Sequence, residues 1–551
     1  MKKTIRFLSL ALSALMTVSL AGCLTTTTSS DVYYDENSTI VIEGEGYSST
    51  TKKDKNKGGK GDSSGSTTAG DPVTHETTRK GNATLDYTPV ADAGANYDVK
   101  GTVSIAVDTN RPTDFDAMFD VMQKLYPNVK IKFDYWAHNE SDTSIEYLTT
   151  RAATGKMADI IWDDAGCIPT YIMQGWVYPI TKFVNADPEA ANLPANLKAD
   201  YTYCGELYAL PNSAHFDVTM FNTDLLNKLG LKMPGNEWSF DEYENYLRKA
   251  AAQFSSKLCV GNANLLDNYN RYCWWLAMNV NNKGNARYGQ WGYNYDTQQV
   301  DANYLIEGTK KLRYFRTMTP GVEAWYESTQ KGTNGISNLE NTLGISSSDA
   351  AWSAGKALIF DTNTAGTNST GTKYKFGTQF VPTPNKGGHL SMHVDCSFIT
   401  TACKDENIEA AYQLLRFMTI STNGNLARLT MYEDSQKGKY ALNSRIYYPT
   451  TSSKAVLEKF EKLSVTTDTD VYMVKNIPNS GRFDVHKLVP DMYDSFFKDA
   501  ATSLNNVMEG KDDGSGMNES IIKWNKTIKS NIDNMNSEIK KVQASFNKTH
   551  K

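Results

Sequence analysis

The sequence predicts an α/β fold built on a parallel sheet and divided between two lobes. From residue 101 to residue 162, predicted strands and helices alternate in the order strand, helix, strand, helix, strand. That order is typical of parallel sheets with crossover helices. The chain has 551 residues, and about 450 remain after the N-terminal segments described below, more than one hydrophobic core usually holds.

The first strands and helix follow from the spacing of apolar residues. Val103, Ile105 and Val107 occupy alternate positions, as on one face of a strand. Apolar residues within 115–125 recur at intervals of three and four, as on one face of a helix, and Pro127 ends that pattern. Further strands are expected at 129–135, 158–162, 208–211, 218–221, 357–360 and 376–382, and further helices at 408–419 and 521–546.

The last predicted helix is strongly amphipathic. Its apolar residues from Ile521 to Phe546 step by three or four positions. Such a helix either caps a lobe or forms a dimeric coiled coil. We expect a cap on a monomer.

The first 98 residues predict export and attachment to a membrane. A basic start and an apolar run from Phe7 to Leu20 have the layout of a signal peptide over residues 1–22, too short to span a bilayer. The tetrapeptide Leu20-Ala21-Gly22-Cys23 resembles the bacterial lipobox, whose cysteine is acylated, for example with palmitate. An ordinary cleaved signal is the alternative.

Residues 23–98 are expected to form a disordered tether after the lipidated Cys23. They are rich in Thr, Ser, Gly and Lys and cannot bury enough apolar surface to fold. A flexible chain of ~70 residues spans roughly 45 Å. We therefore expect residues 99–551 to work on the extracytoplasmic face of a bacterial cell membrane, held there by the lipid.

Composition excludes several classes of function. The net charge of -5 argues against binding to nucleic acid. Aromatic residues make up 11% of the chain, including 31 Tyr and 10 Trp, more than a core needs, so some can stack on sugar rings. No Walker-type phosphate loop is present, and we expect no cofactor.

Six cysteines follow Cys23, namely Cys167, Cys204, Cys259, Cys273, Cys396 and Cys403. None lies at CxxC or zinc-ligand spacing, so we expect no metal. They either form three disulfides, in one of fifteen pairings, or remain thiols.

Polar residues after the predicted strands are candidates for ligand contacts. Ligands of open α/β sheets bind beyond the carboxyl ends of the strands. Asp163 and Asp164 directly follow one strand, although either could instead cap the next helix. Trp136 ends another strand and is either a stacking platform or core, whereas Trp162 is expected in the core.

A later segment has alternating polar residues. If 388–395 is a strand, His389, Ser391, His393 and Asp395 share one face. The face could line a cleft, lie in solvent or, least expectedly, hold a metal. We take His393 and Asp395 as candidate ligand-binding residues.

Six segments, in order, resemble motifs of the extracellular solute-binding proteins of ABC importers (family 1), close to the maltose and oligosaccharide branch. They are LYPNVKIKFDYW (125–136), the block from Arg151 to Ile180, the block from Gly205 to Leu231, WSFDEYENYLRKAA (238–251), AAWSAGKALIFDTN (350–363) and NIEAAYQLLRFMT (407–419). Each motif alone is weak, but six in order over about 300 residues are specific.

The resemblance implies a periplasmic-binding-protein-like type II fold, in which two α/β lobes joined by hinge crossovers close on a ligand. Lobe 1 is expected at about 99–212 plus 373–405, and lobe 2 at about 213–372 plus 406–551. The chain would leave lobe 1 near Asn212–His215, return near 361–373 and cross again after the 390s. The implied partners are a small solute and the transmembrane subunits of an ABC permease.

The resemblance also implies positions for ligand contacts. His215 falls where the maltose-type family has a polar contact at the first crossover. Tyr272, Trp274 and Trp275 lie in a segment that resembles the second-lobe source of stacking aromatics. The family often has an aromatic after the strand at 357–360; this chain has Asp361 and Asn363 there, which implies a more polar contact.

These observations favour a non-catalytic receptor for a sugar or oligosaccharide. The alternative is a surface lipoprotein that binds glycan without a transporter or hydrolyses glycosides. Hydrolysis would need two carboxylates, such as Asp163 with Asp361 or Asp395. No motif of a catalytic nucleophile is present.

Overall fold

The computed structural model describes Arg79 and residues 81–108, 113–136, 144–164, 166–262, 288–319, 342–345, 348–364, 374–382, 391–439, 441–442, 446–492, 503–504, 506–507 and 510–550. All of them belong to one compact unit. The predictions made for Cys23, Tyr272, Trp274 and Trp275 lie outside the described residues.

The first half of the sheet has the predicted strand and helix alternation. Strands β1 (Gly101–Asp108), β2 (Val129–Trp136) and β3 (Ile160–Asp164) are parallel, with β1 in the middle. Helices α2 (Thr113–Leu125) and α3 (Ser144–Thr154) connect them. The antiparallel strand β12 (Ser391–Ile399) then pairs with β3. Parallel neighbours arise because each strand returns through a helix.

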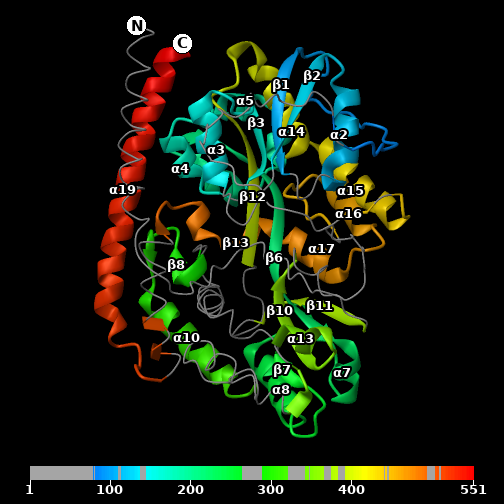
Figure 1. Cartoon of the computed structure of the whole chain (residues 1–551), viewed down its shortest axis with the longest axis vertical. Helices are drawn as coiled ribbons and strands as arrows, with labels where there is room; N and C mark the ends of the chain where they lie inside the picture. Colours follow the sequence, from blue (N-terminus) through cyan, green and yellow to red (C-terminus); the bar gives the residue numbers. More distant parts are fainter. Residues whose placement is uncertain are drawn as a thin grey trace, which may run out of the picture. The chain divides into compact units, whose positions relative to one another are not determined.

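One long strand, β6 (Leu210–Asn222), joins the two halves of the sheet (Figure 1). Its part up to Phe216 pairs with β12, and its part from Asp217 onward pairs with β10 (Ala357–Asn363). The predicted strands at 208–211 and 218–221 are thus one strand. The order across the whole path is β2-β1-β3-β12-β6-β10-β7. β6 therefore supplies the first hinge crossover.

The return crossover comes later than expected. Strand β11 (Phe376–Phe380) still pairs with the second part of β6, and the chain reaches the first half of the sheet only with β12. The boundary predicted near 361–373 is therefore too early. The apolar pattern of β11 predicts a strand but not which part of β6 it pairs with.

Helices cover both halves. α7 (Thr223–Lys228), α8 (Phe240–Ala251), α10 (Ala302–Arg316) and α13 (Ser348–Ser353) accompany the second half, which also contains β7 (Val260–Asn262). Ser239 and Glu242 form a capping box that begins α8. Trp352, 1% exposed, lies in the small core of this half. Trp162, 2% exposed, packs edge-on against Phe115 in the core of the first half, as predicted.

Helices α14 (Ile408–Met418) and α15 (Thr422–Gln436) pack on the first half of the sheet, against β1, β12 and α2. The prediction assigned all of 406–551 to lobe 2, which is wrong for these helices. Every residue of α14 from Ala410 to Met418 is buried. A helix so extensively buried needs neighbours on several sides, and its sequence does not say which sheet provides them.

The segment before β1 is also part of the fold. Arg79 and residues 81–99, here called the strap, run over α2, α14 and α15, and Leu85 is only 3% exposed. The predicted tether therefore does not extend to residue 98. Composition predicted a tether because most residues of the strap are small or polar. Its few apolar and acidic side chains nevertheless contact the helices.

The remaining elements complete the unit. Short helices are α4 (Ile168–Met173), α5 (Thr181–Ala186), α6 (Ala195–Asp200), α16 (Lys454–Glu461) and α17 (Asp468–Lys475). The small strands are β4 (Thr202–Tyr203), β5 (Glu206–Leu207), β8 (Tyr293–Asn294), β9 (Gln299–Val300) and β13 (Gly481–Arg482). Within the described part of the chain, no helix is long and apolar enough to cross a membrane.

The predicted C-terminal helix is α19 (Met517–Thr549), 33 residues long (Figure 1). Its buried stripe includes Trp524 and Ile532. α19 packs against α4, which follows β3, and also against β9 and α10. It is thus a surface helix, but it covers elements that accompany both halves of the sheet rather than one lobe.

The cysteines do not form a full set of disulfides. Cys204, Cys259 and Cys403 are free thiols. Because these are three of the six, the alternative with three disulfides is excluded. Cys273 lies outside the described residues.

Candidate functional site

The candidate site lies where β6 and β12 extend beyond the end of β3. Asp164, the last residue of β3, pairs with Cys396, so the first residues of β12 continue past the parallel strands. Opposite them, His393 pairs with His215 and Asp395 with Ser213. Because side chains alternate along a strand, these polar residues share one face, as predicted for His393 and Asp395.

A third segment adds charge to this face. Strand β13 pairs with β12, and the chain after it contributes Asp484 and Lys487. Asp484 is fully buried and Lys487 is 5% exposed. We call the assembled group the hinge cluster; its members are His215, Asp217, Ser391, His393, Asp395, Asp484 and Lys487.

His393 is held between two buried carboxylates. Its Nδ1 lies against Oδ1 of Asp484, and its Nε2 is 3.4 Å from Oδ1 of Asp217. Burial alone would lower the pKa of His393, but attraction to Asp484 and Asp217 outweighs burial and raises the pKa to about 10. His393 is therefore an imidazolium at neutral pH and ties β6, β12 and Asp484 together.

Asp484 is a carboxylate surrounded by cationic side chains. Its Oδ2 lies 3.5 Å from Nζ of Lys487 and 3.4 Å from Nε of Arg482, and it accepts the N–H of Val394. Burial would raise the pKa of Asp484, but attraction first to His393 and then to Lys487 holds it well below its ordinary value. The carboxylate is therefore ionised and fixed in place.

The accessible edge of the cluster consists of Asp395 and His215, whose side chains are 17% and 20% exposed. Oδ1 of Asp395 is 3.2 Å from Nζ of Lys487, and Oδ2 is 3.8 Å from Nε2 of His215. Lys487 orients the carboxylate and balances its charge. A fixed carboxylate beside an imidazole can accept hydrogen bonds from hydroxyl groups of a solute.

Asp361 has a different position from the one predicted. It is fully buried and accepts hydrogen bonds from Thr219 Oγ1 (2.7 Å), Tyr243 OH (3.2 Å) and Asn262 Nδ2 (2.6 Å). The carboxylate joins β6, α8 and β7 inside the second half of the sheet. Its prediction as a ligand contact is not supported, because the carboxylate is fully buried and is bonded by three side chains. The alternation along a strand did not reveal this burial.

The other candidates are placed by their backbones. Asn363, half-buried at the end of β10, pairs with Asp217 and so lies beside the hinge cluster. Trp136 ends β2, and Asp163 and Asp164 end β3. These positions are at the carboxyl ends of parallel strands, and ligand contact by these side chains stays a prediction.

Three members of the cluster were not predicted from sequence. Asp217 follows His215 by two positions on the same strand, so alternation along 213–217 could have revealed it. Asp484 and Lys487 carry no local signal, because they reach the site only through the pairing of β13 with β12. Among the described residues no group of three His, Cys, Asp or Glu side chains could hold a metal ion.

Comparison with known proteins gives one family and several similar structures. The family model for bacterial extracellular solute-binding proteins matches residues 106–421. No curated protein matches the chain.

Among solved structures, an ABC substrate-binding protein from Listeria monocytogenes in complex with cycloalternan is 15% identical, with a TM-score of 0.53, and the match covers 79% of this chain and 99% of that one. A maltose-bound protein of T. maritima is 14% identical, with a TM-score of 0.52 over 78% of this chain and 99% of that one. A cyclic α-maltosyl-1,6-maltose binding protein from Arthrobacter globiformis is 15% identical, with a TM-score of 0.52 over 80% of this chain and 100% of that one.

At these identities the structural matches establish the fold, which is the two-lobed, periplasmic-binding-protein-like fold expected from the sequence. The family match covers more than half of the chain, including β6, the hinge crossover and most of the hinge cluster. The chain belongs to the family of bacterial extracellular solute-binding proteins.

Proposed function

We propose that this protein is the lipid-anchored substrate-binding component of an ABC importer, which captures a neutral sugar or oligosaccharide between its lobes and delivers it to the permease. The observation that carries the proposal is the accessible edge of the hinge cluster. His215 and Asp395 lie on the two strands that extend toward the second half of the sheet, and their side chains, like that of His393, remain partly exposed beside the buried Asp217, Asp484 and Lys487.

The chemistry of this edge favours hydroxyl groups. The carboxylate of Asp395 lies 3.2 Å from the ammonium of Lys487, which balances its charge, and its oxygens can accept hydrogen bonds. A neutral polyhydroxylated solute can bind there without adding an uncompensated charge. Sugar ligands named for three similar structures agree with this choice.

The carbohydrate is identified by thermal unfolding against a panel of neutral mono- and oligosaccharides, with amino acids and polyamines for comparison. A ligand present at 100 times its Kd stabilises the folded state by about 2.7 kcal/mol. We expect at least one neutral saccharide to raise Tm in a saturable manner. Stabilisation only by charged solutes would contradict the proposed ligand class.

The hydrolytic alternative has less support. One of its proposed carboxylates, Asp361, is buried and fully engaged with Thr219, Tyr243 and Asn262. The binding role predicts that a saccharide incubated with the protein is recovered unchanged by chromatography. Release of shorter sugars would identify a hydrolase instead.

Anchoring through Cys23 is tested separately. Full-length protein expressed in a bacterial host should partition into the detergent phase of Triton X-114, and Cys23→Ser should move it to the aqueous phase. Equal partition of both proteins would argue against a lipid at Cys23, without bearing on the ligand.

A further inference from the structure

We propose that the strap is a clasp that makes the chain from Arg79 onward part of the first lobe and brings the upstream segment out beside the first turns of α2. The inference does not depend on the ligand proposed above. It rests on three groups of side chains, on α14, α15 and α2, that bind the strap.

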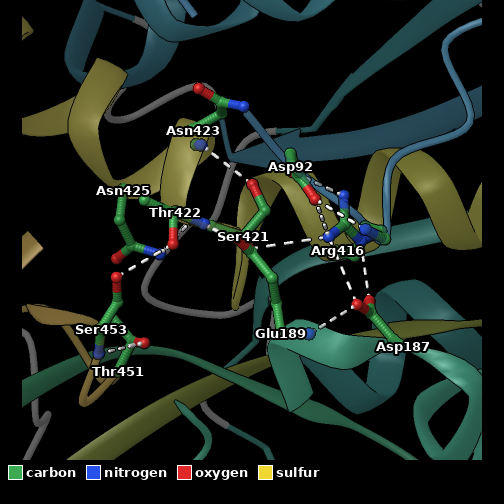
Figure 2. Close-up of polar contacts among 12 residues, drawn as sticks. Asp92, Asp187, Glu189, Arg416, Ser421, Thr422, Asn423, Asn425, Thr451 and Ser453 are labelled. Atoms are coloured by element: carbon green, nitrogen blue, oxygen red, sulfur yellow. Dashed lines mark hydrogen bonds and ion pairs between the residues drawn. The ribbon is translucent and has the colours of Figure 1, made fainter. Parts of the chain in front are cut away.

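The first group is centred on Arg416 of α14, which is fully buried (Figure 2). Its Nη1 and Nη2 donate to the two carboxylate oxygens of Asp92 at 3.0 and 2.8 Å, and its Nε donates to Asp187 at 2.7 Å. Asp92 belongs to the strap and Asp187 to the folded lobe. Without the strap, the guanidinium would lose its bidentate partner in a buried site.

The second group is a single side chain, Asn423 of α15, which is also fully buried. Its Oδ1 accepts the N–H of Val90 and the hydroxyl of Tyr87, both at 2.8 Å. Its Nδ2 donates to the carbonyl of Val90 at 2.9 Å and to Tyr97 OH at 3.1 Å. An amide can form four such bonds, so the strap satisfies this buried side chain completely.

The third group consists of Asp116 and Asp120 on α2. Asp116 accepts Nη1 of Arg79 at 2.9 Å and the N–H of Ala83 at 2.7 Å. Asp120 accepts the N–H of Leu85 at 3.2 Å. In each group, polar atoms of the helices form hydrogen bonds or ion pairs with specific atoms of the strap. A peptide that only lay against the surface would not form such a set of contacts.

The order of these contacts gives the strap a direction. Its last residues meet β1, where Thr102 donates to Asn407 at the start of α14. Its first residue, Arg79, lies at the first turn of α2, which follows the other end of β1. β1 has 8 residues, or about 26 Å, so the strap returns the chain to the carboxyl ends of the parallel strands. The upstream segment therefore leaves the lobe at the end of the sheet that faces the candidate site.

Glycine is required where the strap passes Arg416. A methyl group at Gly94 would overlap the carboxylate of Asp187 and lie 2.7 Å from Nη2 of Arg416. Gly94→Ala should therefore separate the middle of the strap from α14. Gly235→Ala is the matched control, because a methyl group there meets no atom within 4 Å.

Hydrogen exchange of the full-length protein, read by mass spectrometry, tests the inference. In the wild type, residues 83–96 should exchange as slowly as α14. Gly94→Ala should accelerate exchange in 83–96 by at least about tenfold, and Gly235→Ala should leave it unchanged.

A milder variant covers the possibility that Gly94→Ala unfolds the lobe. Tyr87→Phe removes one bond to Asn423 and should accelerate exchange of 83–96 by a few-fold, with α14 unchanged. Exchange of 83–96 in the wild type at the rate of an unstructured peptide would overturn the proposal. So would Gly94→Ala protein whose strap remains as protected as in the control.

Discussion

Replacing His393 with glutamine tests the electrostatic account of the hinge cluster. The ordinary histidine pKa of 6.5 rises to about 10 in the fold, although burial opposes the charge, because Asp484 and Asp217 attract it. Each pKa unit corresponds to about 1.4 kcal/mol. The imidazolium therefore contributes about 5 kcal/mol to the stability of the folded state at low pH, as an order of magnitude.

The sign of the pH dependence follows from the raised pKa. The contribution is complete below pH 6.5 and is lost as pH rises toward 10, because the unfolded histidine releases its proton first. His393→Gln leaves Asp217 and Asp484 without their shared cation. The variant should be less stable by about 3–5 kcal/mol at pH 6, and the difference should fall to about 1–2 kcal/mol at pH 9.

The assay is equilibrium unfolding in urea, followed by tryptophan fluorescence at pH 6, 7, 8 and 9. His550→Gln is the matched control, because this side chain lies near the surface just after α19, where it faces the exposed Asp405 at 3.6 Å and stacks on Phe546; it should change stability by no more than about 1 kcal/mol. NMR of the histidine side chains adds a direct readout. Parallel stability curves for wild type and His393→Gln, or titration of His393 near pH 6.5, would refute the reasoning.

Three further predictions concern other parts of the fold. Asp361→Ala should lower the free energy of unfolding by about 3 kcal/mol, since it removes a buried acceptor shared by three buried donors. Asp533→Ala, exposed on α19, should have little effect, and equal losses would contradict the assigned role. Asn525→Ala should lower the free energy of unfolding by about 1–2 kcal/mol, because the amide forms hydrogen bonds with both the N–H and the C=O of Val300. If the exposed variant Asn534→Ala lost as much stability, the contact with Val300 would not hold α19 in place. Burial raises the pKa of the Cys259 thiol to about 11, so this cysteine should resist iodoacetamide at pH 8 until the protein is unfolded; rapid alkylation in the native state, measured by peptide mass spectrometry, would contradict that burial.

The sequence predicted most local structure because each element carries its own periodicity. β1, β2, α2, α14 and α19 all appear within a few residues of the expected ranges. It was harder to predict which half of the sheet each element joins. The apolar patterns of α14 and β11 would be the same on either half. The strap was missed for a related reason: its composition resembles a tether, and only side chains such as Asn423 and Arg416, more than 300 residues away, make it fold.

The candidate site was predicted in part. Alternation along β12 correctly placed His393 and Asp395 on one face, and the resemblance to the family placed His215 at the crossover. Asp484 and Lys487 could not be found, because their positions depend on a pairing made by two residues of β13. Asp361 shows the opposite error, since a polar residue on a strand was taken as a ligand contact when it joins three buried donors.

The central claim is that the accessible edge of the hinge cluster binds the solute. It is tested most directly by calorimetric titration of wild type, Asp395→Asn and Asp533→Asn with the saccharide that raises Tm most. We expect saturable 1:1 binding to the wild type and to Asp533→Asn, and at least about tenfold weaker binding to Asp395→Asn, through loss of a charged hydrogen-bond acceptor. Equal affinity of Asp395→Asn and wild type would contradict the claim and place the binding site elsewhere.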